Sequence, residues 1–403
     1  MLFVAICRAL SAAPTAEGEV VGELKLFDRN PEFLLPWKLS FAKGSAGEQT
    51  FAYKIDTSNT RLVVSGRINP LTGDGSWQIE EGRVDVAVWL GLLAPQLGPI
   101  LSGASAQGVF IVSGRGTLRQ GQALGQVEIK LSDCVLAHAE QGWKLEGIAF
   151  KGEFALDLAA VRVISTAPFE LTIGTITHPR FGARNLSLHA QLTERRTLKL
   201  SDGRIEIAGG EMIIDPAEVL LSPLGIDLNL HINRVGLQDI VLLVPAAGLA
   251  DARGRIDGVV RAKWSAATDF QVGVGYLELR DDEPTVVRLT PSLGLLTGRL
   301  EPFIDFSPYI GKMLGRFIRP ENPAYKDLQN VELGKSELRV TSLRVNLTPD
   351  GDEKGRSATV QFVAQPMEKG STVKQVTFDV NVAGSLNQVL KVGMEQEFSI
   401  KAY

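Results

Sequence analysis

The chain has 403 residues and a formal net charge of −4. This acidic balance argues against nucleic-acid binding, because proteins that bind nucleic acid carry a basic surface. With 44% hydrophobic and 22% charged residues, the chain is expected to fold, and it is long enough for a sizeable core and more than one domain.

Residues 1–20 form an N-terminal segment that resembles neither a complete signal peptide nor a membrane anchor. Arg8 interrupts the short apolar run from Leu2 to Ile6, and no basic residue precedes that run. No stretch of the sequence approaches the ~20 apolar residues that span a bilayer. We therefore expect the chain to lack the N-terminal portion of a longer protein; secretion by a weak signal is the alternative.

Residues 21–290 contain one pattern twice, near residues 76–160 and 197–280. Each copy reads as a strand ending in Arg-Val, a short apolar helix with a proline in its later part, and a glycine-rich strand. The short helices are expected within residues 88–101 and 238–249. The alternating strand that follows each copy completes the repeat.

Residues Gly225 to Arg234 show the clearest strand pattern. Apolar side chains alternate with Asp227, Asn229 and His231, which gives the strand one apolar and one polar face. The same alternation recurs along the chain. The residues expected to line the apolar face are Val127, Ile129, Leu131, Phe150, Phe154, Leu156, Phe169, Leu171, Ile173, Ile226, Leu228, Leu230, Ile232, Phe378 and Val380.

Residues 291–403 are predicted to form a C-terminal β region with an amphipathic helix near residues 309–319. Pro308 and Pro320 mark the ends of that helix. Residues 321–326 are predicted as loop, with strands at 338–347, 359–364 and 373–384. An end-cap or membrane contact is expected at Phe303, Phe306, Tyr309, Lys312 and Phe317; ordinary packing of the helix on the sheet is the alternative.

The pattern as a whole predicts an all-β fold with a few short amphipathic helices. Typical strand and connection lengths imply roughly 18–22 strands, which place on the order of 60 apolar side chains on one surface. Three short helices cover only part of such a surface. The sheet must therefore close on itself as a sandwich or barrel, or coil into an elongated groove whose apolar inside holds a ligand.

Catalytic chemistry has little support in the sequence. The four histidines lack partners at metal-ligand spacing, and there is no Gly-x-Ser-x-Gly elbow. The acidic run from Asp281 to Glu283 precedes Pro284, which is typical of a solvated turn. We predict that the protein is not an enzyme and that it uses no cofactor or metal.

Residues 198–264, which begin LKLSDGRIEIAGGEMIIDPAEVLL and continue through RVGLQDIVLL, resemble the repeating unit of the AsmA-like superfamily. The resemblance is closest to the C-terminal half of the YdbH-like proteins of Gram-negative bacteria, with TamB and YhdP as relatives. It covers the chain from about residue 76 onward, and the tail VTFDVNVAGSLNQVLKV is similar to the end of that group. We expect the anchoring helix of the family to be absent from this chain.

The resemblance implies an elongated, twisted β-sheet coiled into an apolar groove in the periplasm. Such a groove bridges the inner and outer membranes and carries phospholipid by its acyl chains, with components of both membranes as partners. Two alternatives from other classes are a scaffold for outer-membrane protein assembly and a closed β-sandwich or β-helix structural protein.

Overall fold

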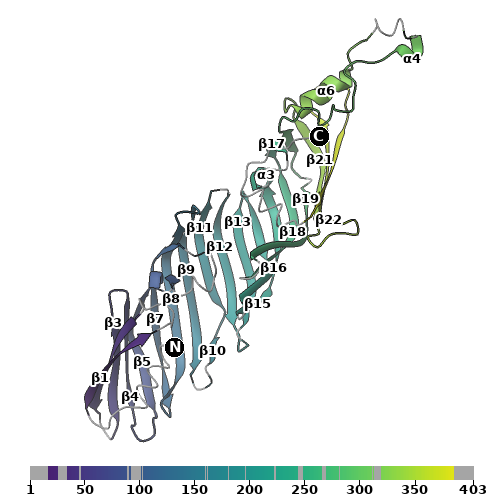
Figure 1. Ribbon diagram of the computed structural model, residues 1–403. Helices are drawn as coiled ribbons and strands as arrows, with labels where there is room; N and C mark the ends of the chain where they lie inside the picture. The colour runs from purple at the N-terminus through teal and green to yellow at the C-terminus, as the bar shows by residue number, and fades with distance from the viewer. Residues whose placement is uncertain are drawn as a thin grey trace. The chain divides into compact units, whose positions relative to one another are not determined.

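The computed structural model describes residues 17–25, 34–44, 47–88, 90–91, 101, 103–158, 160, 162–179, 181–195, 197–221, 224–243, 248–265, 269–280, 282–310, 312 and 319–384. Within these residues, 23 strands belong to one hydrogen-bonded sheet and the helices are few and short (Figure 1). The all-β prediction is confirmed. The strand number slightly exceeds the predicted 18–22 because several strands, such as β6 (Ser105–Gln107), are very short.

The chain divides into two compact units. The first comprises residues 1–205, 215–226 and 265–269, and the second comprises residues 206–214, 227–264 and 270–403. The ranges 21–290 and 291–403 expected from the sequence remain a prediction. In the part of the chain that the structure describes, no helix has the length and apolar character needed to cross a membrane.

The first unit is a meander of antiparallel strands. β1, β2, β3, β4, β5, β7, β8, β9, β11 and β12 pair in that order, while β6 pairs with β8, β10 with β9 and β13 with β15. The bounds are β1 Gly18–Lys25, β2 Leu34–Lys43, β3 Gln49–Asp56, β4 Thr60–Ile68, β5 Gly75–Asp85, β7 Val109–Arg119, β8 Gln122–His138, β9 Trp143–Asp157, β10 Arg162–Ser165, β11 Phe169–His178, β12 Phe181–Leu192, β13 Thr197–Ile207 and β15 Ala217–Leu221.

The core of the first unit lies on the apolar face of β2 to β5. Strict alternation in β3 buries Phe51, Tyr53 and Ile55 and exposes the residues between them. Trp77 of β5 joins this core, and its indole Nε1 donates to the Leu124 carbonyl at 3.3 Å, although the two residues are far apart in sequence. The Trp77 ring therefore lies over Gly125 of β8, two strands away in the same ladder, where a Cβ atom would approach it within 2.7 Å.

The second unit combines strands with short helices. Its bounds are β14 Gly210–Ile214, β16 Leu224–Gly236, α3 Leu237–Leu243, β17 Leu249–Arg253, β18 Arg255–Ser265, β19 Asp269–Leu279, β20 Thr285–Leu289, α4 Ser307–Ile310, α6 Pro323–Glu332, β21 Leu338–Leu347, β22 Arg356–Pro366 and β23 Val376–Ala383. Its core includes Ile256, Val287, Val331, Leu338 and Ala364. Helices α3 and α6 thus supply side chains to a core built mainly by strands.

The two copies of the sequence pattern share one local geometry. The amide of Val86 donates to the Gly108 carbonyl, and the amide of Leu237 donates to the Gly254 carbonyl, both at 3.0 Å. Gly108 and Gly254 have φ angles of 142° and 137°, a conformation in which side chains are strained. In each copy a strand therefore turns directly into a helix beside a left-handed glycine.

The predicted helix bounds need correction in both copies. Helical residues begin at 86 in the first copy and at Leu237 in the second, because each helix follows its strand without a loop. The range 238–249, within which the second helix was expected, also extends one residue into β17, which begins at Leu249. Residues 89, 92–100 and 244–247 lie outside the described residues.

The C-terminal helices also differ from the prediction. The predicted helix near 309–319 corresponds to α4, which begins at Ser307, and residue 312 is helical; residues 311 and 313–318 lie outside the described residues. The loop predicted at 321–326 is wrong, because α6 begins at Pro323. The Asn322 side chain caps α6 by accepting from the Ala324 amide at 3.1 Å. An N-cap asparagine followed by proline is a helix-start signal that the sequence contained.

Candidate functional site

An apolar surface crosses five strands of the first unit. Residues opposite each other in an antiparallel ladder point to the same face, and the strand registers place one residue from each strand in a continuous row. The members of this row are Phe110 of β7, Leu131 of β8, Phe150 of β9, Leu171 of β11 and Leu188 of β12. Leu131 is buried, whereas the other four side chains are half-buried. We call these five residues the apolar row.

Neighbouring rows widen the same face. Ile129 lies opposite Gly152, Phe154 lies opposite Val127, and Phe169 lies opposite Ala190. Ile173 lies opposite Leu186 and Leu156 lies opposite Gly125. All nine residues predicted from β8, β9 and β11 therefore lie on one face. Whether they contact a ligand stays a prediction.

Three phenylalanines gather at the centre of this face. The ring centroids of Phe150 and Phe169 are 5.2 Å apart, those of Phe154 and Phe169 are 5.9 Å apart, and those of Phe150 and Phe154 are 6.3 Å apart. A Cβ atom at Gly152 would lie 2.9 Å from both the Phe150 and Phe154 rings. The two rings therefore cover Gly152, and only glycine leaves room for them.

Exposure changes along the face of the first unit. In β2 and β3, Leu39, Tyr53 and Ile55 are 0% exposed. Val127 belongs to the same closed core, and Ile129 and Leu156 pack against it. Farther along, Phe150, Phe154, Phe169, Leu171 and Ile173 are only half-buried. The apolar face is thus sealed at the β2–β5 end and partly open from β9 to β12.

Strand β16 carries four more of the predicted residues. Ile226 belongs to the first unit, and Leu228, Leu230 and Ile232 belong to the second; all four are half-buried. Met212 lies opposite Ile232, which packs against the core of the second unit. On the polar face, Arg261 donates to both carboxylate oxygens of Asp227 at 2.6 and 2.7 Å. These hydrogen bonds lower the pKa of Asp227.

The two predicted residues of β23 differ from each other. Phe378 is half-buried and lies 5.5 Å from the Phe362 ring, against the core of the second unit. Val380 is 51% exposed although it belongs to the same row as Val345 and Val360. Among the described strands, β23 pairs with β22 alone, so Val380 has a neighbouring strand on one side only.

The predicted end-cap residues lie in the second unit. Phe303, Tyr309 and Lys312 are exposed, and Phe306 is half-buried. Phe317 lies outside the described residues. The structure thus shows exposed aromatic side chains here, while their contact with a membrane stays a prediction.

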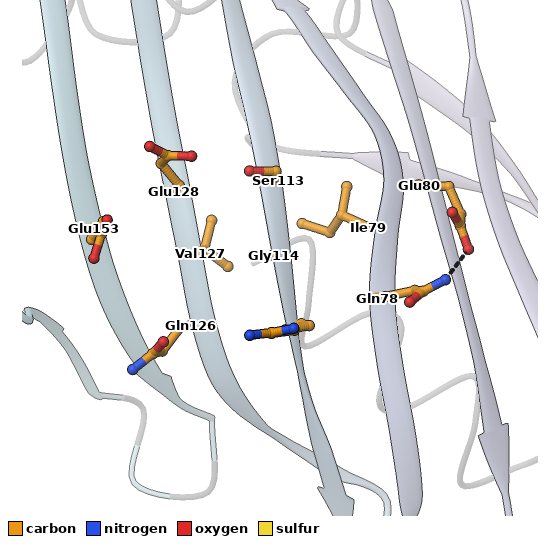
Figure 2. A pocket seen from close by; sticks show the side chains of 10 residues that line it. Gln78, Ile79, Glu80, Ser113, Gly114, Gln126, Val127, Glu128 and Glu153 are labelled. Atoms are coloured by element: carbon orange, nitrogen blue, oxygen red, sulfur yellow. Dashed lines mark hydrogen bonds between the residues drawn. The ribbon is translucent and has the colours of Figure 1, made fainter.

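The polar face of the first unit bears a shallow depression between β5, β7, β8 and β9 (Figure 2). Glu80 lies at a bulge of β5 and accepts hydrogen bonds from Ser65 and Gln78, which lower its pKa. Hydrogen bonding and ion pairing with Lys130, followed by Lys151, lower the pKa of Glu128. Both carboxylates are thus held in their charged form, Glu80 by neutral hydrogen-bond donors and Glu128 by two lysines, as on an ordinary solvated sheet face.

The described residues show neither a set of metal ligands nor an activated thiol. Over the described ranges, no group of three or more His, Cys, Asp or Glu side chains is placed to hold a metal. The Cys134 thiol is buried, and burial raises its pKa. His189 pairs with Asp202 at 3.1 Å, and His178 stacks on Phe181.

Sequence reasoning missed Phe110, Leu186 and Leu188 as members of this face. Leu186 and Leu188 gave a signal, because they alternate with the polar Ser187, whereas Phe110 lies in the uninterrupted apolar run 109–112, which does not show which residues share a face. What the sequence could not supply was the register, which places Phe110 and Leu188 in one row although four strand-to-strand pairings separate them.

The fold and this face define an all-β protein whose sheet keeps an apolar surface partly open. A family model described as YdbH-like, "Intermembrane phospholipid transport protein YdbH", matches residues 36–303. The chain therefore belongs to the YdbH-like family, whose members transport phospholipid, and the resemblance expected from the sequence is confirmed. The match begins earlier than residue 76, and the similar tail lies beyond it. No curated protein and no solved structure shows a significant match to the chain.

Proposed function

We propose that the half-buried apolar face from β9 to β12 holds phospholipid acyl chains while they pass between the inner and outer membranes of a Gram-negative envelope. The observation that carries this proposal is the apolar row, four of whose five large apolar side chains are only half-buried, Leu131 being the buried one. A carrier needs such a surface, because acyl chains must be sheltered from water and still be able to leave.

The energetics are compatible with transient holding. Each CH₂ group removed from water contributes about 0.8 kcal/mol, so about ten buried groups contribute on the order of 8 kcal/mol. No specific pocket is required for binding of this strength. In this proposal the polar face, with its solvated carboxylates, keeps the protein in the aqueous periplasm, and components of both membranes are its partners.

Site-specific photocrosslinking tests the proposal. p-Benzoylphenylalanine is placed at Phe150 or Phe169 on the apolar face, and at Lys151 or Glu170 on the opposite face of the same strands. The full chain is purified from an envelope preparation, illuminated and analysed by mass spectrometry. We expect phospholipid adducts at Phe150 and Phe169 and few at the matched positions. Equal labelling of both faces, or no lipid at either, would contradict lipid holding by this surface.

A further inference from the structure

A second group of exposed apolar side chains lies in the second unit, in the segment of loops and short helix α4 between β20 and α6. Its six exposed side chains are Leu293, Leu295, Leu300, Phe303, Ile304 and Tyr309, which we call the loop surface. Leu293 is 74% exposed and Tyr309 is 84% exposed. Single exposed apolar residues need no explanation, but six within one short segment mark an interaction site.

A buried carboxylate holds the first half of the loop surface in place. Glu332 at the end of α6 is fully buried, and its carboxylate accepts hydrogen bonds from the amides of Leu296 and Thr297 at 2.9 and 3.1 Å. The Thr297 hydroxyl donates to the same carboxylate at 2.7 Å. The Leu296 side chain packs against the core of the second unit. With this backbone fixed, Leu293 and Leu295 remain exposed beside it.

Main-chain hydrogen bonds hold the second half. The Ile304 amide donates to the Pro320 carbonyl at 3.0 Å, and the Asn322 amide donates to the Pro302 carbonyl at 2.8 Å. Phe303 and Glu321 form an isolated antiparallel bridge. The exposed side chains therefore project from an ordered backbone, so little conformational entropy remains to be lost when they bind.

We propose that the loop surface docks the protein on a phospholipid bilayer. Leucine, isoleucine, phenylalanine and tyrosine side chains flanked by basic residues are typical of interfacial membrane contacts, and Arg299, Lys312 and Arg319 are exposed in the same segment. The surface is built on loops, and α4 lies on a loop that extends away from α6 (Figure 1). A fluid bilayer accommodates such projections, whereas a protein partner must supply a complementary surface of roughly 800 Å².

Charge adds to the attraction without dominating it. The exposed Arg299, Lys312 and Arg319 suit anionic headgroups, but Glu301 and Asp305 stand in the same segment. We therefore expect the apolar side chains to bind zwitterionic vesicles, and anionic lipid to strengthen this binding several-fold. Salt should remove only the increase in affinity that anionic lipid provides. This inference does not rest on lipid holding by the apolar row of the first unit.

Vesicle flotation tests the docking surface. The full chain is mixed with vesicles of phosphatidylcholine alone or of phosphatidylethanolamine and phosphatidylglycerol. The test variant is Leu293→Ser/Phe303→Ser/Tyr309→Ser. The matched control is Leu71→Ser/Ile111→Ser/Val274→Ser, which removes three apolar side chains that are also exposed but lie elsewhere in the chain. We expect the test variant to lose at least tenfold in partitioning to both kinds of vesicle, and the control to bind as the unchanged chain does.

Three results would overturn the inference. The first is equal loss in the test variant and the control, and the second is no loss in the test variant. The third is that the unchanged chain does not bind vesicles but forms a dimer, as measured by ultracentrifugation, and that the test variant does not form this dimer. A Phe150→Asp variant separates the two proposals, because it should lose crosslinked lipid yet still float with vesicles.

Discussion

The difference between a sealed and a partly open apolar position is visible in single residues. Leu39 and Leu171 are both leucines on the apolar face of the first unit, yet Leu39 is fully buried and Leu171 is half-buried. A carboxylate introduced at Leu39 would be desolvated without a partner, whereas one at Leu171 could still reach water. Substitutions at these two positions therefore show whether the apolar face is open to water.

We expect Leu39→Asp to unfold the first unit, with a loss of several kcal/mol. Leu171→Asp should stay folded, lose about 1–2 kcal/mol of partly buried apolar contact and retain little phospholipid. Urea unfolding and lipid analysis of the purified variants provide the measurement, with Thr117→Asp at an exposed position as the control. If Leu171→Asp unfolds as Leu39→Asp does, this face is closed and cannot hold lipid.

At the scale of elements, α6 and the loop after β20 are joined by Glu332. Burial by itself would raise the pKa of this carboxyl. Hydrogen bonds from the Thr297 hydroxyl and from the amides of Leu296 and Thr297 outweigh burial, so that the net effect is a lowered pKa. A carboxyl with a lowered pKa stabilises the fold above its unfolded-state pKa of about 4.5, and this stability is lost as pH falls toward the folded-state pKa. The link between helix and loop is thus acid-sensitive.

Glu332→Gln should therefore cost about 2–3 kcal/mol near pH 7, because it removes charged hydrogen bonds in a buried place. Below about pH 4.5 the difference between the variant and the unchanged chain should shrink, since the carboxyl of the unfolded chain then takes up a proton while the folded one, with its lowered pKa, does not yet do so. Thermal melting of both chains from pH 3.5 to 7 measures this, and Glu301→Gln, at an exposed carboxyl, serves as the control. A difference that is constant with pH would exclude an ionised Glu332 as the link.

At the scale of the molecule, each unit has its own hydrophobic core. One core is centred on Leu39, Tyr53 and Val64, and the other on Ile256, Val287 and Leu338. Every buried residue of each core lies within one unit. Distant sites with no shared partners usually act independently on stability, so the two units are expected to respond separately to mutation.

Leu39→Ala and Leu338→Ala test this independence, because both side chains are fully buried. Each should cost about 2–5 kcal/mol. Native-state hydrogen exchange should show faster exchange in β2 to β4 for Leu39→Ala and in β20 to β22 for Leu338→Ala. Faster exchange in both regions for either variant would mean that the chain unfolds as one cooperative unit.

Much of the fold was predictable because the strand period is local. Side chains alternate every two residues whatever the rest of the chain does, so Phe150, Phe154, Leu171 and Ile173 could be assigned to one face from the sequence. The glycine-punctuated repeats likewise indicated where strands turn into helices. The α6 helix was missed although Asn322 and Pro323 signalled its start, because short helices depend on packing more than on propensity.

The sequence by itself thus determined an all-β chain with one apolar face, its approximate strand positions and its family. Only the tertiary structure decided how far that face is open. Exposure depends on sheet curvature and on contacts between residues far apart, such as Trp77 with Leu124 or Glu332 with Thr297. No local pattern encodes such contacts. For this reason, two leucines with the same strand signal, Leu39 and Leu171, differ in whether water or a ligand can reach them.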